Sequence, residues 1–261
     1  RSVWYRKPAP YGLSSAIPAA QRDFAKEECR VAVHGLYNFI RDKMWIDDPV
    51  LLKHVSNKPY QLNIARRLGF IIPSTLITNS PKLAQEFCDH HKGQVIYKTL
   101  SAPFISPDSS ETGDQIAVYT TLVDTQVPNI WESVRLTPCL FQKCIIKALD
   151  LRVTVVGNDV FAAEIFSQTD PITSTDWRHG DINDMEHRVH TLPNEIADLC
   201  RDLLRALGLN FGAIDLILTP DSQYVFLEIN PNGQYGWIEC LTALPISKSI
   251  AKLLASPLDA S

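Results

Sequence analysis

Apolar residues recur along the chain with two different periods, which predict a mixture of helices and strands. Helical spacing occupies five segments, at 18–41, 57–69, 80–91, 194–207 and 237–254. Asn57 is a suitable N-terminal cap for the second of these helices, and Gly69 is suited to end it. In the last segment we expect Pro245 to break the helix, because proline lacks the backbone donor that a helix needs.

Runs of β-branched and aromatic residues predict strands at 2–6, 70–78, 94–100, 139–146, 151–156, 160–166, 212–218 and 224–230. Turn residues at 157–159 and 219–222 join the last four strands into two antiparallel hairpins. Such hairpins after mixed helices and strands predict an α+β fold rather than a regular alternation of parallel strands. Residues 101–115 are polar and aperiodic, and a loop of this length in an ordered domain is typical of a lid.

Composition narrows the class of protein. The chain has 261 residues, 45% of them hydrophobic, which is enough for a sizeable core and argues against intrinsic disorder. A formal net charge of −4 argues against a general binder of nucleic acid or of membrane surfaces. No apolar run is long enough to span a bilayer. Six cysteines without a CxxC pair favour reduced, buried thiols and a cytoplasmic location.

The segment VFLEINPNG carries the most informative polar pattern. Side chains alternate along a strand, so Glu228 and Asn230 share one face, and Leu227 and Ile229 share the other. If the last hairpin pairs as its turn indicates, Asp215 joins Glu228 and Asn230 on their face. Two carboxylates and an amide oxygen are ligands that suit Mg²⁺. The alternative is a set of outward-facing polar residues on a half-exposed sheet, but the exit Asn-Pro-Asn-Gly favours a built site.

Cations within apolar strands form the second informative pattern. Lys98, Lys143 and Arg152 each lie in or beside a predicted strand. A single lysine in such a strand usually extends its ammonium group to solvent. Several cations near a predicted metal-binding hairpin instead indicate a polyphosphate site, where lysine acts as a point charge and arginine as a fork.

Together these motifs resemble an ATP-grasp ligase, and more narrowly the ligases that macrocyclise ribosomal peptides of the microviridin (graspetide) class. The resemblance covers nearly the whole chain and rests on NKPYQLNIARRLGFIIPSTLIT, VIYKTL, LFQKCIIKALDLRVTVVG, DWR, GAIDLIL and VFLEINPNGQYGWIE. It implies the ATP-grasp fold, with an N-terminal-domain remnant and linker helix at 1–45, a central α/β subdomain at 46–135 that carries the lid loop, and a C-terminal antiparallel-sheet subdomain at 136–261. The opening SVWYRKP resembles the end of the family's N-terminal domain, so we expect that domain to be largely missing.

The resemblance also implies ATP and Mg²⁺ as cofactors, with a role for each matching residue. It assigns nucleotide contacts to Lys58, Lys98, Gln142, Lys143, Cys144 and Ile145, the ribose position to Asp150, phosphate and acyl-phosphate contacts to Arg152 and Arg178, and magnesium to Asp215, Glu228 and Asn230. Two departures stand out. Lys143 occupies a position that is usually acidic in the family, and Gly113 is the one glycine of the predicted lid.

The implied activity is an ATP-dependent ligase that forms ω-ester or ω-amide crosslinks in a precursor peptide through an acyl phosphate. Its implied partners are the leader and core of that peptide and a second copy in a homodimer, with no nucleic acid and no membrane. Two alternatives share the same nucleotide and metal residues. One is a ligase that adds an amino acid to a small acid or a protein terminus, and the other is a nucleotide-binding protein without ligase activity.

Overall fold

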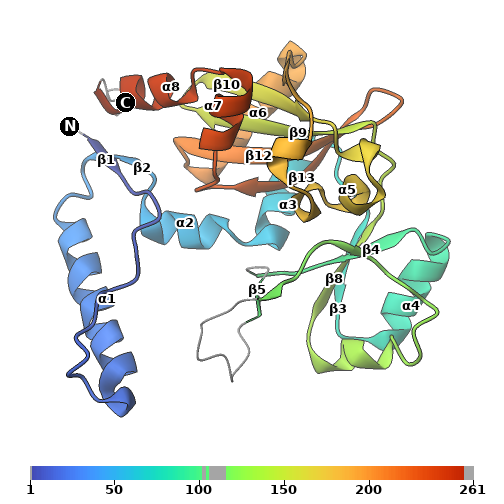
Figure 1. The fold of residues 1–261 in the computed structure, drawn as a ribbon, viewed down its shortest axis with the longest axis horizontal. Coiled ribbons are helices and arrows are strands. Elements are labelled where there is room, and N and C mark those ends of the chain that lie inside the picture. Colours follow the sequence, from blue (N-terminus) through green and yellow to red (C-terminus); the bar gives the residue numbers. More distant parts are fainter. Residues whose placement is uncertain (1, 102–103, 106–115, 256–261) are drawn as a thin grey trace.

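The computed structural model describes residues 2–101, 104–105 and 116–255, so most of the predicted lid at 101–115 lies outside the described residues. The chain forms two lobes, each built on an antiparallel sheet, and an N-terminal helix that stands apart from both (Figure 1). Because the strands pair antiparallel within both lobes, the predicted α+β class is confirmed.

The larger lobe contains a five-stranded antiparallel sheet in the order β11-β10-β9-β12-β13. Its strands are β9 (Leu149–Val156), β10 (Asp159–Ile165), β11 (His187–His190), β12 (Phe211–Leu218) and β13 (Tyr224–Asn230). Gly157 has a φ of 56° and supplies the left-handed backbone that the tight turn between β9 and β10 requires. Both hairpins predicted from the sequence are therefore present.

The two faces of this sheet differ in chemistry, because side chains alternate along each strand. All eight residues of β9 are buried. Its odd-numbered members belong to a hydrophobic core, namely Leu149, Leu151, Val153 and Val155. The even-numbered members lie on the opposite face and include the buried polar residues Asp150, Arg152 and Thr154. This second face therefore carries buried charge, and the candidate site lies there.

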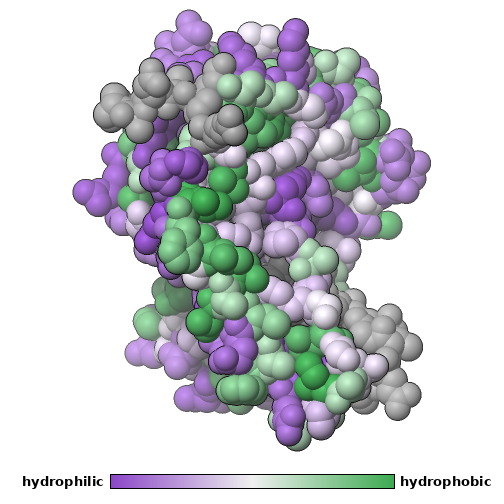
Figure 2. All heavy atoms as spheres, turned by 90° about the vertical axis from the view of Figure 1, so that its left-hand side faces the viewer, coloured by the Kyte–Doolittle hydropathy of each residue, from purple (hydrophilic) through white to green (hydrophobic). Residues whose placement is uncertain are grey.

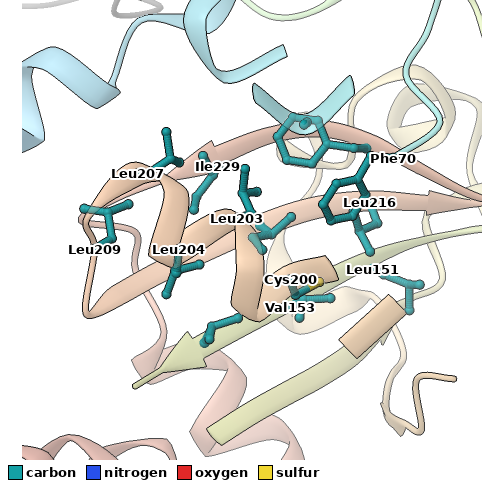
Figure 3. Packing of buried hydrophobic residues seen from close by; sticks show 14 of the residues in the cluster. Phe70, Leu151, Val153, Cys200, Leu203, Leu204, Leu207, Leu209, Leu216 and Ile229 are labelled. Atoms are coloured by element: carbon teal, nitrogen blue, oxygen red, sulfur yellow. The ribbon is translucent and has the colours of Figure 1, made fainter. Parts of the chain in front are cut away.

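Helices cover the apolar face of the larger sheet. They are α2 (Pro49–Val55), α3 (Lys58–Leu68) and α6 (Asn194–Leu207). Asn57 accepts a hydrogen bond from the Tyr60 N–H at the start of α3, and Gly69 ends the helix in a left-handed conformation, as predicted. Leucines of α6 and Phe70 pack on strands β9, β12 and β13 in a close-packed core (Figure 3). This core holds the strands, and with them the charged face, in fixed register.

A second hydrophobic cluster lies at the far end of the charged face. There Val156 and Phe211 pack against Ile238 of α7 (Gly236–Thr242) and Ile246 of α8 (Ile246–Ala255). The helical segment is interrupted between α7 and α8, at residues 243–245, which confirms the predicted break at Pro245.

The smaller lobe is a four-stranded antiparallel sheet in the order β3-β8-β4-β7. Its strands are β3 (Thr75–Thr78), β8 (Cys139–Lys143), β4 (Val95–Lys98) and β7 (Thr121–Leu122), and α4 (Pro81–His90) packs on it. A separate short hairpin consists of β5 (Phe104–Ile105) and β6 (Ile116–Ala117). A further helix, α5 (Pro171–Thr175), belongs to the connection between β10 and β11 in the larger lobe.

Strand pairing groups the chain differently from the ranges 46–135 and 136–261 drawn from the sequence. Strand β8 begins at Cys139 but pairs with β3 and β4 of the smaller lobe. Helices α2 and α3 precede that lobe in sequence, yet pack in the core of the larger one. The chain therefore enters the smaller lobe after Ile72 and leaves it after Lys143, because sheet pairing rather than chain order defines each lobe.

The N-terminal segment reaches the larger lobe through β1 (Ser2–Trp4), which pairs in parallel with β2 (Met44–Ile46). Between them, α1 (Arg22–Asn38) buries none of its residues. Phe24 and Phe39 are 71% and 85% exposed. Figure 2 shows the face that carries α1, where apolar side chains gather in a band. The helix thus presents an apolar surface that the described residues of this chain leave uncovered.

The six cysteines are free, as expected. Only Cys88 and Cys200 are buried, and the prediction of a buried thiol is wrong for Cys240, which is exposed on the short helix α7. Within the residues that the structure describes, none of the helices combines the length and apolar character needed to cross a membrane.

Candidate functional site

Three charged side chains form a row across the charged face of the larger sheet. Arg152 of β9 lies beside Asp215 of β12, and Asp215 lies beside Glu228 of β13. The guanidinium Nη1 of Arg152 donates to Asp215 Oδ1 at 2.6 Å. Asn230 also belongs to this group, because its Nδ2 donates to Asp215 Oδ2 at 3.4 Å. The predicted convergence of Asp215, Glu228 and Asn230 is therefore observed.

A β-bulge in β13 sets the direction of these side chains. The register of β12 and β13 shifts between Asp215 and Leu216, which leaves Leu227 as the extra residue. As a result Phe226 and Ile229 both lie in the hydrophobic core. Leu227 lines a cavity on the charged face together with Glu228. The expectation that Leu227 shares the face of Ile229 is wrong, because strict alternation holds only without a bulge.

Cations from three separate elements surround Glu228. The Lys58 ammonium lies 3.4 Å from Glu228 Oε2, and it also donates to the Thr99 carbonyl at 2.8 Å. Arg178 Nη1 lies 3.7 Å from Glu228 Oε1. Burial raises the pKa of Glu228, but Lys58, Lys98 and Arg178 together outweigh it, so this pKa lies below its ordinary value. The carboxylate is therefore ionised at neutral pH.

The remaining charges of the site respond to burial in opposite ways. Burial raises the pKa of Asp215, and the Glu228 carboxylate adds to the rise, whereas Arg152 opposes it. Burial lowers the pKa of Lys98, and the charge of Lys58 acts in the same direction. Burial thus disfavours the charged form of both side chains, and only a neighbour of opposite charge, Arg152 for Asp215 and Glu228 for Lys98, favours it.

Arg178 is held by a carboxylate that sequence reasoning did not single out. Its Nε and Nη2 donate to the two oxygens of Asp176 at 2.8 and 2.7 Å. Asp176 is 5% exposed and also accepts the Thr120 N–H from the smaller lobe at 3.0 Å. Burial opposes ionisation of Asp176, but Arg178 outweighs it and holds its pKa below the ordinary range. The motif DWR thus folds into a clamp that aims Arg178 at Glu228.

A cavity of about 270 Å³ lies between the two lobes, on the charged face. Its lining includes eight of the residues predicted from the sequence, namely Lys98, Lys143, Cys144, Ile145, Asp150, Arg178, Asp215 and Glu228. Apolar side chains line it too, among them Ile96, Leu216 and Ile217. A mixed lining of this kind suits a ligand with a flat apolar ring and an anionic part.

The predicted adenine stretch connects the lobes at this cavity. The Gln142 side chain is buried and donates to Thr75 Oγ1 at 3.0 Å, so it does not line the cavity. The backbone N–H groups of Lys143 and Cys144 are bonded to the carbonyls of Ser74 and Gln94. Within the described residues, the Ile145 N–H has no hydrogen-bond partner. This group is therefore the backbone donor of the stretch that remains for a ligand.

Lys147 is a second site residue that the sequence pattern did not reveal. Its ammonium donates to Asp150 Oδ2 at 2.6 Å, and both side chains are 6% exposed. Ser167 also donates to this oxygen, at 2.5 Å. The spacing of Lys147 and Asp150 in KALD was visible in the sequence, but a pair three residues apart is normally an exposed pair on a helix. Here it is the buried start of β9.

A second cavity, of about 890 Å³, lies on the other side of the charged row. Its lining includes the predicted residues Arg152, Arg178, Asp215 and Asn230, and also Tyr5, Lys7, Lys53, Trp177 and Trp237. The two cavities share Trp177, Arg178 and Asp215. The charged row therefore separates a smaller cavity, which lies between the two lobes, from a wider one.

The donors in this row fit a magnesium ion. Asp215 and Glu228 supply carboxylate oxygens, and Asn230 supplies an amide oxygen. In the part of the chain that the structure describes, three or more His, Cys, Asp or Glu side chains do not gather into a metal cage. Two carboxylates and an amide oxygen suit Mg²⁺, which is usually held by one or two carboxylates and completed by water and phosphate.

No protein-family model matches the sequence, and no curated protein matches it. Solved structures do match. An ATP-grasp ligase associated with ribosomal peptide biosynthesis, from Chryseobacterium gregarium, is 35% identical over 97% of this chain and 76% of its own, with a TM-score of 0.88. Its structure is a complex with ADP and with a leader and core peptide.

Two macrocyclases from Microcystis aeruginosa MRC also match over 97% of this chain. MdnC, bound with the precursor peptide MdnA, is 34% identical over 78% of its own chain, with a TM-score of 0.83. MdnB is 33% identical over 76% of its own chain, with a TM-score of 0.77. These matches confirm the resemblance seen in the motifs. The chain belongs to the family of ATP-grasp ligases of ribosomal peptide biosynthesis that includes the microviridin macrocyclases.

Proposed function

We propose that this protein is an ATP-dependent ligase that crosslinks side chains of a ribosomal precursor peptide through ω-ester or ω-amide bonds. The observation that carries the proposal is the row of Arg152, Asp215 and Glu228 between two cavities that share Asp215 and Arg178. We assign the smaller cavity to the nucleotide and the wider one to the peptide, so that the two substrates meet at the row. The relative from Chryseobacterium supports this, since its structure holds ADP with leader and core peptide.

The smaller cavity suits ATP by its lining. The Ile145 N–H offers a donor to the adenine edge, and apolar neighbours such as Ile96 and Leu216 offer contact to its ring. Lys58 and Lys98 lie near Glu228, where phosphates would place their negative charge. Asp150 retains one carboxylate oxygen, Oδ1, for a ribose hydroxyl, since Lys147 and Ser167 both bond Oδ2.

Magnesium completes this proposal. Asp215, Glu228 and Asn230 would hold it, and it would supply positive charge to the phosphate oxygens during transfer. We locate these sites by the two lobes rather than by the domain ranges drawn from the sequence. The proposed ion then lies on the larger lobe, and the adenine stretch lies between the lobes.

The reaction has two steps, and neither of them needs a side-chain nucleophile from the protein. A carboxylate oxygen of the peptide attacks the γ-phosphorus of ATP, the bond to the β-phosphate breaks, and ADP leaves. A hydroxyl or amine of the peptide then attacks the carbonyl carbon of the acyl phosphate, loses its proton, and displaces phosphate. Anionic groups meet in the first step, so its rate depends mainly on charge neutralisation. Arg152 and Arg178 are placed to supply it.

The wider cavity suits a peptide that carries carboxylates. Lys7 and Lys53 belong to its lining, in addition to the two arginines of the row. Burial lowers the pKa of Lys7, and the positive charges of Arg6 and Arg152 add to this effect. A carboxylate that binds there relieves repulsion among these cations, which favours an acidic core peptide as the substrate.

Two further parts of the proposal concern the setting of the enzyme. The exposed apolar surface of α1 and of the residue that follows it, with Phe24 and Phe39, is the surface that we assign to a homodimer. Free thiols and the use of ATP favour the cytoplasm. The net charge of −4 argues against general binding to nucleic acid or to an anionic membrane.

Mass spectrometry of a precursor peptide tests the proposed reaction. The protein is incubated with Mg²⁺, ATP and a peptide whose core is rich in Thr, Ser, Asp and Glu. We expect ADP release that depends on the peptide, and loss of the mass of one water for each bond formed. Omission of ATP and replacement of the core by a peptide without carboxylates are the controls.

Other outcomes would replace the proposal by a named alternative. A gain of one amino-acid residue in mass would identify a ligase that adds a free amino acid. ATP binding with no peptide-dependent ADP release, for a panel of precursor peptides, would identify a nucleotide-binding protein without ligase activity.

A further inference from the structure

Arg6 joins the N-terminal segment to the turn that follows the candidate metal ligands. It lies just after β1, and its guanidinium reaches across 226 residues of sequence to residues 232–234. Nη1 donates to the Asn232 carbonyl at 3.1 Å, to Asn232 Oδ1 at 2.8 Å and to the Gly233 carbonyl at 2.9 Å. Nη2 donates to Gln234 Oε1 at 3.0 Å. One side chain therefore bonds three consecutive residues of the turn.

Aromatic rings hold the guanidinium in this position. Its central carbon lies 5.3 Å from the centre of the Tyr235 ring and 5.9 Å from that of Phe211. Tyr235 directly follows the turn, and Phe211 begins β12. Arg6 is thus fixed against the larger lobe by both stacking and hydrogen bonds, which no lysine could reproduce, because lysine lacks the planar fork.

The turn at 231–234 is connected to the charged row at both of its ends. It begins after Asn230, whose amide bonds Asp215, and it ends at Gln234, whose carbonyl accepts a hydrogen bond from Arg152 Nη2 at 3.4 Å. The turn is also packed tightly on β12. A Cβ built on Gly233 would lie 2.5 Å from the Cβ of Ala213 and 3.1 Å from that of Asn230. Movement of the turn therefore moves Asn230 and Arg152.

We propose that Arg6 is a positioning residue for the candidate metal and phosphate site. It fixes the turn at 231–234, and through the turn it fixes the Asn230 side chain and the Arg152 guanidinium. Arg6 does not touch the row itself, so it acts on geometry rather than on the reacting atoms. This inference rests on the proposed function, because it assumes that Asn230 and Arg152 serve a metal ion and a phosphate.

Electron paramagnetic resonance with Mn²⁺ tests the role of Arg6 without turnover. Mn²⁺ replaces Mg²⁺, ADP is present, and the signal of free Mn²⁺ reports binding. We expect Arg6→Ala to weaken Mn²⁺ binding by about 10–100-fold, the range typical for residues that orient metal ligands. Arg6→Lys should give little recovery. Arg201→Ala is the matched control, since Arg201 also donates to a backbone carbonyl, that of Asn158, at 2.9 Å.

Kinetics separate positioning from a general loss of structure. In the same variants, kcat for ADP release should fall with Mn²⁺ affinity, while the affinity for ADP measured without a divalent metal ion changes little, because Ile145 and Lys98 are untouched. Asn232→Ala removes the Oδ1 acceptor alone and should give a smaller loss in the same direction. If Arg6→Ala does not fold, judged by circular dichroism, Asn232→Ala decides the question.

Unchanged Mn²⁺ affinity in folded Arg6→Ala, or in Asn232→Ala where that variant decides, would overturn the inference, even if thermal stability fell. Failure of the proposed function looks different. In that case the unaltered protein would itself lack peptide-dependent ADP release, whatever residue stands at position 6.

Discussion

At the scale of single residues, the site depends on charges that are costly to bury alone. Glu228 keeps its charge because Lys58, Lys98 and Arg178 converge on it from α3, β4 and the connection between β10 and β11. Charges held in this way in a partly buried cleft interact more strongly than they would in bulk water. The same arrangement attracts polyphosphate and metal together, since each offsets the charge of the other.

Replacement of Glu228 by Gln tests this arrangement directly. The amide keeps the shape of the side chain but removes a negative charge from the candidate metal site. We expect peptide-dependent ADP release to fall by about 100-fold or more, with the fold unchanged. ADP release is measured by a coupled assay, and far-ultraviolet circular dichroism reports the fold.

Glu186→Gln is the matched control, because Glu186 is an exposed acid that pairs with Arg188 outside both cavities. Normal ADP release in Glu228→Gln would remove Glu228 from the metal site. A similar loss in both variants would mean that the effect is not local to the row.

The positions of residues that share one strand face could be predicted from the sequence by strand alternation. Asp215, Glu228 and Asn230 converge because they occupy one face of a hairpin whose turn is readable. Asp176 was beyond reach, since its contact with Arg178 depends on loop geometry, and its contact with Thr120 joins residues that are distant in sequence. Arg6 was missed for the same reason.

At the scale of elements, the hairpin of β12 and β13 and its exit turn organise the site. The sequence predicted both strands and the caps of α3, because these features depend on neighbours within a few residues. It did not predict the β-bulge at Leu227, because a register shift depends on packing against the partner strand. The bulge matters, since it turns Phe226 into the core while Glu228 stays on the charged face.

Gly233→Ala tests how tightly the exit turn fits. The added Cβ would lie 2.5 Å from the Cβ of Ala213, so the turn must move away from β12. We expect a loss of about 1–3 kcal/mol in the free energy of unfolding, as for other overpacked sites. Mn²⁺ binding in the presence of ADP should weaken as well. Urea unfolding and paramagnetic resonance provide the two measurements.

The chain offers a close control three residues away. A Cβ on Gly236 meets nothing within 4 Å, so Gly236→Ala should leave stability and Mn²⁺ affinity near their original values. Equal behaviour of the two variants would show that the turn is free to move.

At the scale of the whole molecule, the N-terminal segment and the larger lobe are joined through a buried carboxylate. Asp47 is 3% exposed and follows β2. It accepts the backbone N–H groups of Asn210 and Phe211 at 2.8 and 3.1 Å. Burial raises the pKa of Asp47 from 3.8 to about 7, although these two hydrogen bonds oppose the rise. The contact between the N-terminal segment and the larger lobe through Asp47 is therefore sensitive to pH.

The sign of this effect follows from a pKa that is higher in the folded protein than in the unfolded chain. The contribution of Asp47 to stability is fully present below about pH 4 and is lost as pH rises to about 7. At about 1.4 kcal/mol per pKa unit, the change is at most about 4 kcal/mol. Asp47→Asn cannot ionise, so its stability should vary less over this interval.

Urea unfolding at several pH values measures the difference between the two proteins. Asp221→Asn, at an exposed turn, is the control and should follow the unaltered protein. Parallel pH profiles for the unaltered protein and Asp47→Asn would contradict the assigned role of Asp47.

The lobe to which each segment belongs was the feature hardest to predict from the sequence. Strand β8 follows a long aperiodic stretch, and only its pairing with β3 and β4 identifies its lobe. Helices α2 and α3 precede the smaller lobe, and only their burial against the larger sheet shows where they belong. Contacts between distant segments leave no local pattern in the sequence. The family motifs, in contrast, predicted the overall fold.

The two indole rings beside the wider cavity give the molecule a reporter of its own. Trp177 and Trp237 both line that cavity, and their ring centres are 5.3 Å apart. Trp177 adjoins Arg178, so a ligand that contacts this arginine also alters the surroundings of the indole pair. Trp177 also lines the smaller cavity, so we expect binding in either cavity to change the protein's intrinsic fluorescence, which would report ligand binding without any label.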